Sequence, residues 1–191
     1  MRIRIKTKWN KQEREVSAEE IVGVLAFNAW KIGMNAMLEI ENENFDVDRQ
    51  MQRVAVISEI QMLLIHALDR IVYDSVNDED RAVLITTFAK KIADHVHDNA
   101  RDFAGPGDYR SPFIERLNER MADYAETKWD HDNHLPGFSM SHEFATHTAA
   151  ELGPRDNKWA LDYLQQVLLP DVMETFNKVL RKTGLLEKVS A

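Results

Sequence analysis

Residues 16–42 read VSAEEIVGVLAFNAWKIGMNAMLEIEN, and this stretch predicts a long helix with too little polar surface to lie on the outside of a protein. At about 100° per residue, apolar side chains occupy three sides of such a helix. The three sides consist of Val22, Ala26, Trp30, Gly33 and Met37, then Phe27, Met34 and Leu38, then Leu25, Ile32 and Ala36. A helix that is apolar nearly all round belongs at the centre of a bundle, or between a bundle and its partner.

The start of this helix carries two local signals. Ser17 and Glu20 have the spacing of a capping box, in which the serine accepts from the Glu20 amide and Glu20 reaches back. Val16 and Ile21 have the spacing of a hydrophobic staple. We therefore expect the helix to begin close to Ser17.

One thin polar stripe on this helix supplies candidate binding residues: Asn28, Asn35 and Glu39, with Asn42 beyond them. Polar groups on a buried helix must be hydrogen-bonded internally, paired across a dimer, or wetted in a cleft. Asparagine at seven-residue spacing in a helical seam often sets register or oligomeric order. The competing interpretation is a polar ligand pocket that opens onto Glu39. Both interpretations stay open.

The composition favours a single helical domain. A chain of 191 residues is long enough for one full core, and 44% hydrophobic with 29% charged residues is ordinary for a globular protein. Only seven glycines and five prolines leave little material for the many turns of a β-sandwich or barrel. We predict an all-α fold, an antiparallel helical bundle.

Apolar periodicity predicts about six helices, four of them long. After the first helix, it places helices at about 47–75, 79–103 and 111–129, a short one at 139–152, and a last one from 156 to just before Gly184. Pro170 lies inside the last helix and predicts a kink there. Residues 1–15 form a basic N-terminal arm or short strand, and residues 16–191 a single helical-bundle domain.

Charge and targeting signals limit the expected partners. The net charge is −8, and because residues 1–12 carry five basic and no acidic residues, the rest of the chain sums to −13. An acidic body repels phosphate backbones, so nucleic acid is not an expected partner. No window matches the ~20 apolar residues of a membrane span, and no signal peptide is recognisable. We expect a cytoplasmic, bacterial-type protein with no membrane contact.

Most of the histidines lie between His95 and His147, and most of these have an acidic neighbour. Imidazole and carboxylate groups are ligands for zinc, iron or manganese, whereas the absence of cysteine excludes thiolate sites. On a helix, Glu143 and His147 share a face because they are four residues apart. His131 and His134 lie in an irregular stretch, where side chains converge more freely. The candidate metal ligands are His97, Asp98, His131, His134, Glu143 and His147.

Known catalytic patterns find little match. A ferritin-like di-iron site needs Glu-x-x-His pairs, and the chain has none. The doublet His97-Asp98 resembles that of the all-helical HD-type phosphohydrolases, but His131-Asp132 matches it equally well and the neighbouring pattern is missing. No residue role is carried over from that resemblance. The chain also lacks a nucleophile elbow, a phosphate-binding glycine loop and a dinucleotide fingerprint.

The excess of apolar helix surface, without a recognised catalytic motif, favours a protein that acts by binding or protein–protein interaction. We expect a homodimer, an unidentified protein partner and no cofactor. The alternative is a metal-dependent hydrolase or oxidase that uses the six histidine and carboxylate candidates.

Overall fold

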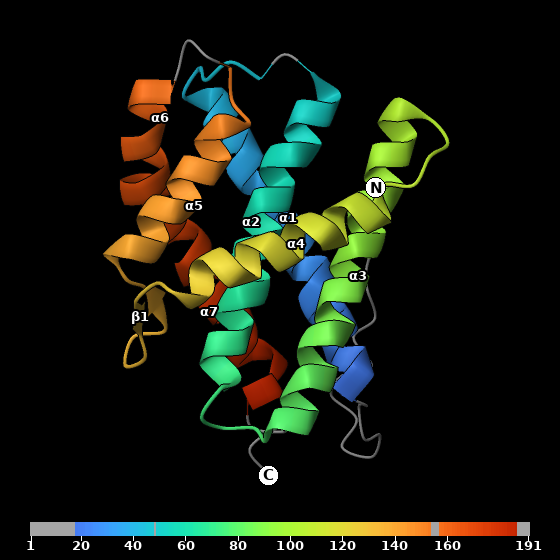
Figure 1. The fold of residues 1–191 in the computed structure, drawn as a ribbon, viewed down its shortest axis with the longest axis vertical. Coiled ribbons are helices and arrows are strands. Elements are labelled where there is room, and N and C mark those ends of the chain that lie inside the picture. The colour runs from blue at the N-terminus through green and yellow to red at the C-terminus, as the bar shows by residue number, and fades with distance from the viewer. Residues whose placement is uncertain (1–17, 48, 154–156, 187–191) are drawn as a thin grey trace, which may run out of the picture.

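The structure, a computed structural model, describes residues 18–47, 49–153 and 157–186. Over this part of the chain it confirms the predicted all-α class, with helices packed together and one tiny two-strand hairpin (Figure 1). The basic arm predicted at residues 1–15 and the Ser17 cap lie outside the described residues.

Six helices are present in the described ranges. They are α1 (Ala18–Asn42), α2 (Gln50–Val72), α3 (Asp78–Ala104), α4 (Arg110–Ala125), α5 (Phe138–Ala150), and a last helix in which α6 (Asn157–Tyr163), the π-helical segment η2 (Leu164–Leu168) and α7 (Leu169–Thr183) follow one another. Between α4 and α5, strands β1 (Trp129–Asp130) and β2 (Leu135–Pro136) pair antiparallel. The prediction carried α4 on to residue 129, where the structure instead begins this hairpin.

Three long helices, α1, α2 and α3, pack against one another and form the body of the bundle. α7 packs along α1, and α5 contacts α6 and η2. Figure 1 shows α4 crossing the long helices at a steep angle, and contacts to α2, α3 and α5 hold it there. This crossing position lets side chains of α4 reach α2 between α3 and α5.

The central helix of the bundle is α2 rather than α1. Every residue from Val56 to Leu68 is buried, including Glu59 and His66. In the sequence these two polar residues stand seven positions apart on the side of the second helix away from its apolar face, which is the pattern of an outer surface. α1 instead lies at the edge of the bundle with one side exposed. The placement of α1 between the bundle and a partner stays a prediction.

α1 passes a length-and-composition test for a membrane span, and this corrects the expectation that no window does. The helix segment that passes runs from Glu19 to Asn42. Of its most apolar window, 56% is buried against the rest of the bundle. Core helices of bundles pass the same test, because they too are long and apolar.

Local signals place most helix ends. Asn77 caps α3 by accepting from the Asp80 amide at 3.0 Å. At α4 the N-cap residue is Tyr109, and the carboxylate of Asp108 just before it accepts from the amides of Arg110 at 3.0 Å and Ser111 at 3.1 Å. Gly184, with φ of 64°, ends α7 in the left-handed conformation that glycine tolerates best.

The disturbance predicted at Pro170 takes the form of a π-helical turn just before the proline. The Leu169 amide donates to the Leu164 carbonyl, five residues back instead of four. Pro170 has no amide hydrogen to continue either pattern. The helix therefore continues through the proline by widening one turn.

The closest approach of α1 to α2 occurs at Gly33. A methyl group there would collide with the side-chain nitrogen of Gln61 and lie 3.0 Å from Ile57 Cγ2. Gln61 is fully buried and its Nε2 donates to the Ala29 carbonyl at 2.9 Å. The side chain cannot yield without losing this buried hydrogen bond.

We expect Gly33→Ala to lower the free energy of unfolding by about 1–3 kcal/mol, because it displaces Gln61 from Ala29 in the core. Gly23→Ala is the matched control, since a methyl group on Gly23 would meet only the Lys91 side chain, at 3.9 Å. The control should gain up to about 1 kcal/mol from helix propensity. Urea unfolding followed by circular dichroism measures both, and equal effects at the two positions would contradict the close-approach argument.

Candidate functional site

The most buried charged residue in the described chain is Glu59 of α2, whose side chain is 0% exposed. Arg120 of α4 holds it with two hydrogen bonds, from Nε to Oε2 at 2.8 Å and from Nη2 to Oε1 at 3.1 Å. A two-pronged guanidinium–carboxylate pair is the arrangement that a buried carboxylate needs to offset lost hydration. The pair fixes α4 across α2.

Further charges extend this pair toward the surface. Arg116 lies 3.8 Å from Glu59 Oε1 and donates to Glu151, at the end of α5, at 2.9 Å. Arg120 also lies 3.6 Å from Asp123. Burial by itself would lower the pKa of Arg120, but the hydrogen bonds and charge of Glu59 outweigh it, so this pKa is raised above its usual value. Arg120 therefore stays charged at any pH at which the bundle is folded.

A neutral histidine, His66, lies seven residues further along α2 than Glu59. His66 is 2% exposed, and its Nε2 accepts from Arg70 Nε at 3.1 Å. Burial, followed by the charge of Arg70, lowers its pKa from 6.5 to about 4. The imidazole is therefore uncharged at neutral pH.

Tyr124 of α4 connects the two ends of this polar cluster. Its ring is 5.4 Å from His66 and 6.4 Å from His147, centroid to centroid. The Tyr124 hydroxyl, His66 Nδ1 and Thr148 Oγ1 are buried, and none of the three has a hydrogen-bond partner among the described residues. Burial, together with the charge of Glu59, raises the pKa of Tyr124, so its phenol stays protonated. The cluster thus combines a charged pair with neutral, unpartnered groups.

His147 of α5 stands where the cluster meets the surface. Its Nε2 lies 3.2 Å from Asp123 and 3.6 Å from Glu143 of its own helix. No hydrogen bond forms at this nitrogen in the described structure, so the contacts are electrostatic only. The predicted pairing of Glu143 with His147 is therefore real, with Asp123 as an added partner.

The other predicted metal ligands lie elsewhere. His97 is on α3 with its ring 6.1 Å from Tyr109, and Asp98 beside it is exposed. His131 lies 3.7 Å from Asp74, whereas His134 takes a left-handed conformation in the hairpin turn. Across the described ranges, no group of three or more histidine and acidic side chains is placed to hold a metal ion.

The predicted ligand-binding stripe on α1 faces outward. Asn28 donates to the Val24 carbonyl of its own helix at 2.8 Å, while Asn35 and Glu39 are exposed. In the single chain, Asn28 is therefore hydrogen-bonded within its own helix, whereas Asn35 and Glu39 are accessible to solvent. Pairing across a dimer stays a prediction.

Beside that stripe, α1 exposes an apolar surface that we call the α1 strip: Phe27, Met34 and Leu38, with exposures of 55%, 45% and 56%. A groove of about 240 Å³ follows it, between α1, the start of α2 and the end of α3. Phe103 of α3, itself 52% exposed, lines the far wall. Trp30 lies deeper and stacks on His95 at 5.9 Å.

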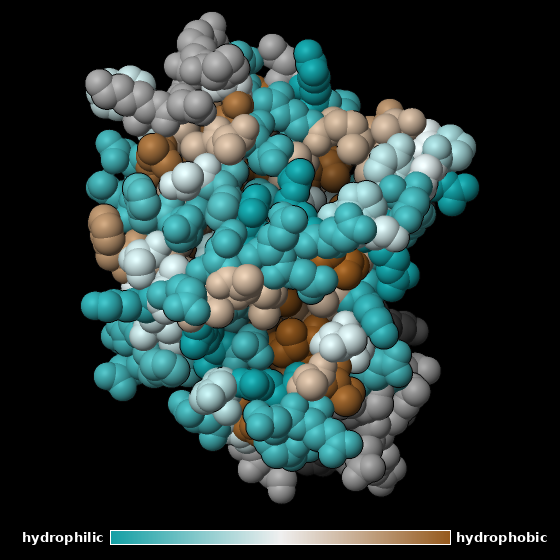
Figure 2. Space-filling view, viewed as in Figure 1, coloured by the Kyte–Doolittle hydropathy of each residue, from teal (hydrophilic) through white to brown (hydrophobic). Residues whose placement is uncertain are grey.

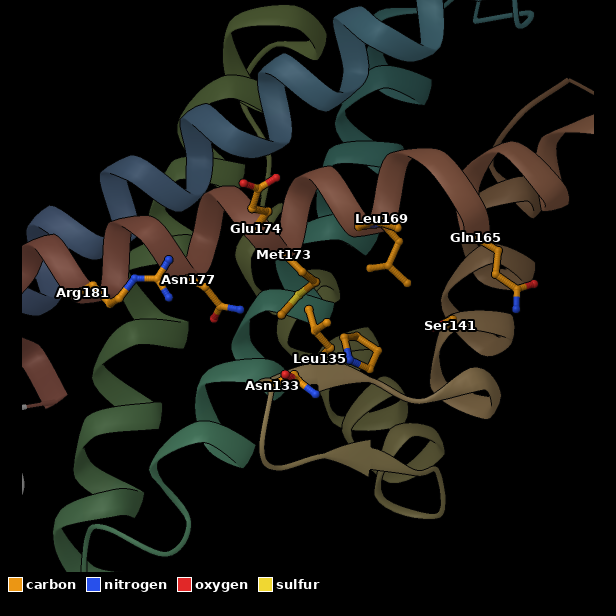
Figure 3. Close-up of a pocket in the computed structure, with 11 residues that line it drawn as sticks. Asn133, Leu135, Ser141, Gln165, Leu169, Met173, Glu174, Asn177 and Arg181 are labelled. Carbon is orange, nitrogen blue, oxygen red and sulfur yellow. The ribbon is translucent and has the colours of Figure 1, made fainter.

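A larger cleft of about 440 Å³ lies against α7 (Figure 3). We call it the α7 cleft. Its walls come from the β-hairpin, α5, η2 and α7. A third hollow of about 320 Å³ lies between α3 and α4.

Figure 2 shows the face of the molecule that α4 crosses. This face is mostly hydrophilic, and hydrophobic residues gather below α4.

Sequence reasoning identified Glu59 and His66 as a repeating feature of α2 but missed the partner that buries them. The signal was available at Arg120, which stands next to Met121 in the apolar stripe of α4. A basic residue beside such a stripe, opposite an acidic residue in an otherwise apolar helix, indicates a buried ion pair.

No protein-family model, curated protein or solved structure matches this chain.

We expect Glu59→Gln to lower the free energy of unfolding by about 3 kcal/mol or more, because it leaves the Arg120 charge buried without its counter-charge. The matched control is Glu174→Gln, which breaks an exposed pair with Lys178 and should leave the free energy of unfolding nearly unchanged. The double variant Glu59→Met with Arg120→Met should cost less than Glu59→Gln. Denaturant unfolding of all three decides, and a small effect of Glu59→Gln would contradict the buried pair.

We expect His66 to make the fold acid-sensitive between pH 6.5 and about 4. In this window the unfolded chain binds a proton at His66 and the folded chain does not, so the stability present above pH 6.5 is lost as the pH falls. The loss attributable to His66 should reach about 2–3 kcal/mol.

The measurement is the difference in unfolding free energy between the wild type and His66→Gln across that pH range, which cancels the titration of the carboxylates. The difference should change with pH. A difference that stays flat across that range would refute the assignment.

Proposed function

We propose that this protein acts by protein–protein interaction and that its α1 strip joins two copies in a homodimer. The observation that carries the proposal is the exposure of Phe27, Met34 and Leu38 on a helix whose other sides form the core of the bundle. Large apolar side chains gathered on one surface, unlike scattered ones, mark interaction sites.

The spacing of the α1 strip suits a helical partner. Phe27, Met34 and Leu38 are separated by seven and four residues, which is the spacing of a coiled-coil seam. Lys31 completes the seam, and its Nζ lies 5.8 Å from the centre of the Phe27 ring. A seam on one helix is complementary to its own copy across a twofold axis, because the same patch meets itself.

The groove beside the strip gives side chains of the second copy a place to insert. Met34 and Leu38 form its near wall and Phe103 its far wall. An ion pair between Arg53 and Glu41 lies at its rim. The four exposed apolar side chains offer on the order of 400 Å² per chain, comparable to the largest patch of a typical monomer and enough for the apolar centre of an interface.

The metal-dependent alternative draws no support from these distances. Of its six candidate ligands, Glu143 and His147 meet each other, and the remainder lie on α3 and in the hairpin. The interaction role is therefore the one that the described geometry favours.

We expect light scattering on a size-exclusion column to give twice the chain mass of 22.1 kDa at micromolar concentration. Met34→Gln with Leu38→Gln should convert the protein to a monomer. Four half-exposed apolar side chains are lost per dimer at about 1 kcal/mol each, which weakens association on the order of a thousandfold.

The matched control is Val83→Gln with Val167→Gln, two apolar residues that are 61% and 50% exposed away from the α1 strip. This variant should stay dimeric. A wild-type protein that remains monomeric at 100-fold higher concentration, about 100 µM, would contradict self-association. Dimers of unchanged affinity in the Met34/Leu38 variant would place the interface elsewhere.

A further inference from the structure

The α7 cleft has the size and construction of a small-molecule site, independent of the α1 strip. Its volume of about 440 Å³ falls within the ~300–1,000 Å³ of ligand pockets. In Figure 3 Leu135, Leu169 and Met173 lie on one side of α7, and α1 runs along the opposite side. An occupant of the cleft and a partner on the α1 strip would therefore not compete for space.

The middle of the cleft is apolar. Leu135 of the hairpin faces Leu169 and Met173 of α7 (Figure 3). Pro136 lines the same cleft. Leu135 is 37% exposed, whereas Leu169 and Met173 are nearly buried and form the floor. Methionine adapts its shape readily, which suits a floor against which a flexible ligand packs.

One end of the cleft is positively charged. Arg181 follows Asn177 on the face of α7 that carries Met173, at four-residue steps. Arg181 is exposed and forms no salt bridge with any residue the structure describes, although its charge helps to lower the pKa of Glu174. Glu174 also lines the cleft and is paired with Lys178, which is the main cause of that lowered pKa. Because Lys178 neutralises Glu174, the guanidinium of Arg181 can bind a carboxylate.

The other end offers a hydrogen-bond acceptor. Ser141 donates to the Gly137 carbonyl at 2.9 Å, which leaves its oxygen available to accept. Beside it, Gln165 of the π-helical turn η2 forms part of the wall. π-helical turns often occur at functional sites.

The hairpin wall is held in place by specific contacts. Asn177 donates to the His134 carbonyl at 3.1 Å and so ties the hairpin turn to α7. Asp130 accepts from the amides of Asp132 and Asn133, both at 3.1 Å, which closes the turn. At its base, a Cβ on Gly137 would lie 2.7 Å from the Lys128 carbonyl, so glycine is required there. The wall is built into the fold, as a pre-formed pocket requires.

We propose that the α7 cleft binds an elongated organic carboxylate with an apolar body. The carboxylate lies at Arg181, the apolar body lies over Met173 and Leu135, and a polar far end reaches the Ser141 hydroxyl. The chemistry of the two ends fixes the direction in which the ligand lies.

The test uses octanoate as probe and octanamide as its uncharged counterpart, each titrated into the full-length protein by calorimetry. Octanoate should bind saturably with a Kd of about a millimolar, as expected for a ligand of its size. Arg181→Gln should raise the octanoate Kd about tenfold, since it removes a charged hydrogen-bond donor, and leave octanamide unchanged. Leu135→Asn should weaken both ligands.

Arg101→Gln is the matched control, because Arg101 is an exposed arginine in the last turn of α3 as Arg181 is in that of α7. It should leave both affinities unchanged. Amide shifts in NMR spectra should map octanoate to the hairpin and α7. Three results would overturn the proposal: no saturable binding, equal octanoate affinity in Arg181→Gln, or shifts on α1 that vanish in the Met34/Leu38 variant.

Discussion

The ion pair between Glu59 and Arg120 is the constraint on which the arrangement of this bundle depends. α2 is buried along its middle, so the Glu59 carboxylate has no access to water and needs a partner with matching geometry. Only a helix that crosses α2 can supply one from the side, and α4 does so. Because Tyr124 lies one turn beyond Arg120, the same crossing sets its ring against His66 and His147. The position of α5 follows, since Arg116 joins it to the pair through Glu151.

The sequence predicted where the helices lie, but it predicted less well which of their side chains are buried and which are exposed. Periodicity and punctuation place a helix within a few residues, since they act over neighbouring positions. The exposure of Phe27, and hence the outward face of α1, depends on which helices pack beside it. Glu59 and His66 read as surface residues because polar side chains usually are, and only the distant Arg120 and Tyr124 reverse that. The α7 cleft was beyond sequence reasoning, because its walls come from four separate elements.

The two proposed surfaces use the two sides of the last helix differently. Along one side α7 packs on α1, whose outer face carries the strip for a second copy. Along the other it forms the floor of the cleft (Figure 3). The bundle can therefore present the apolar α1 strip to a protein and the partly polar α7 cleft to a small molecule, and the two surfaces have no residue in common.

The widened turn at η2 has a geometric consequence for the last helix as a whole. It accommodates one more residue than an α-helical turn, so the buried positions change phase there. Before it they advance in steps of four, and after it they resume from the next residue, the two series being Ala160, Leu164 and Leu168, then Leu169, Val172, Met173, Phe176 and Leu180. In a uniform helix these two series would lie on different sides, and the extra residue of the widened turn brings them closer to a common side. The first half of this helix packs on α5 and the second half on α1, so one helix covers both without a connecting loop.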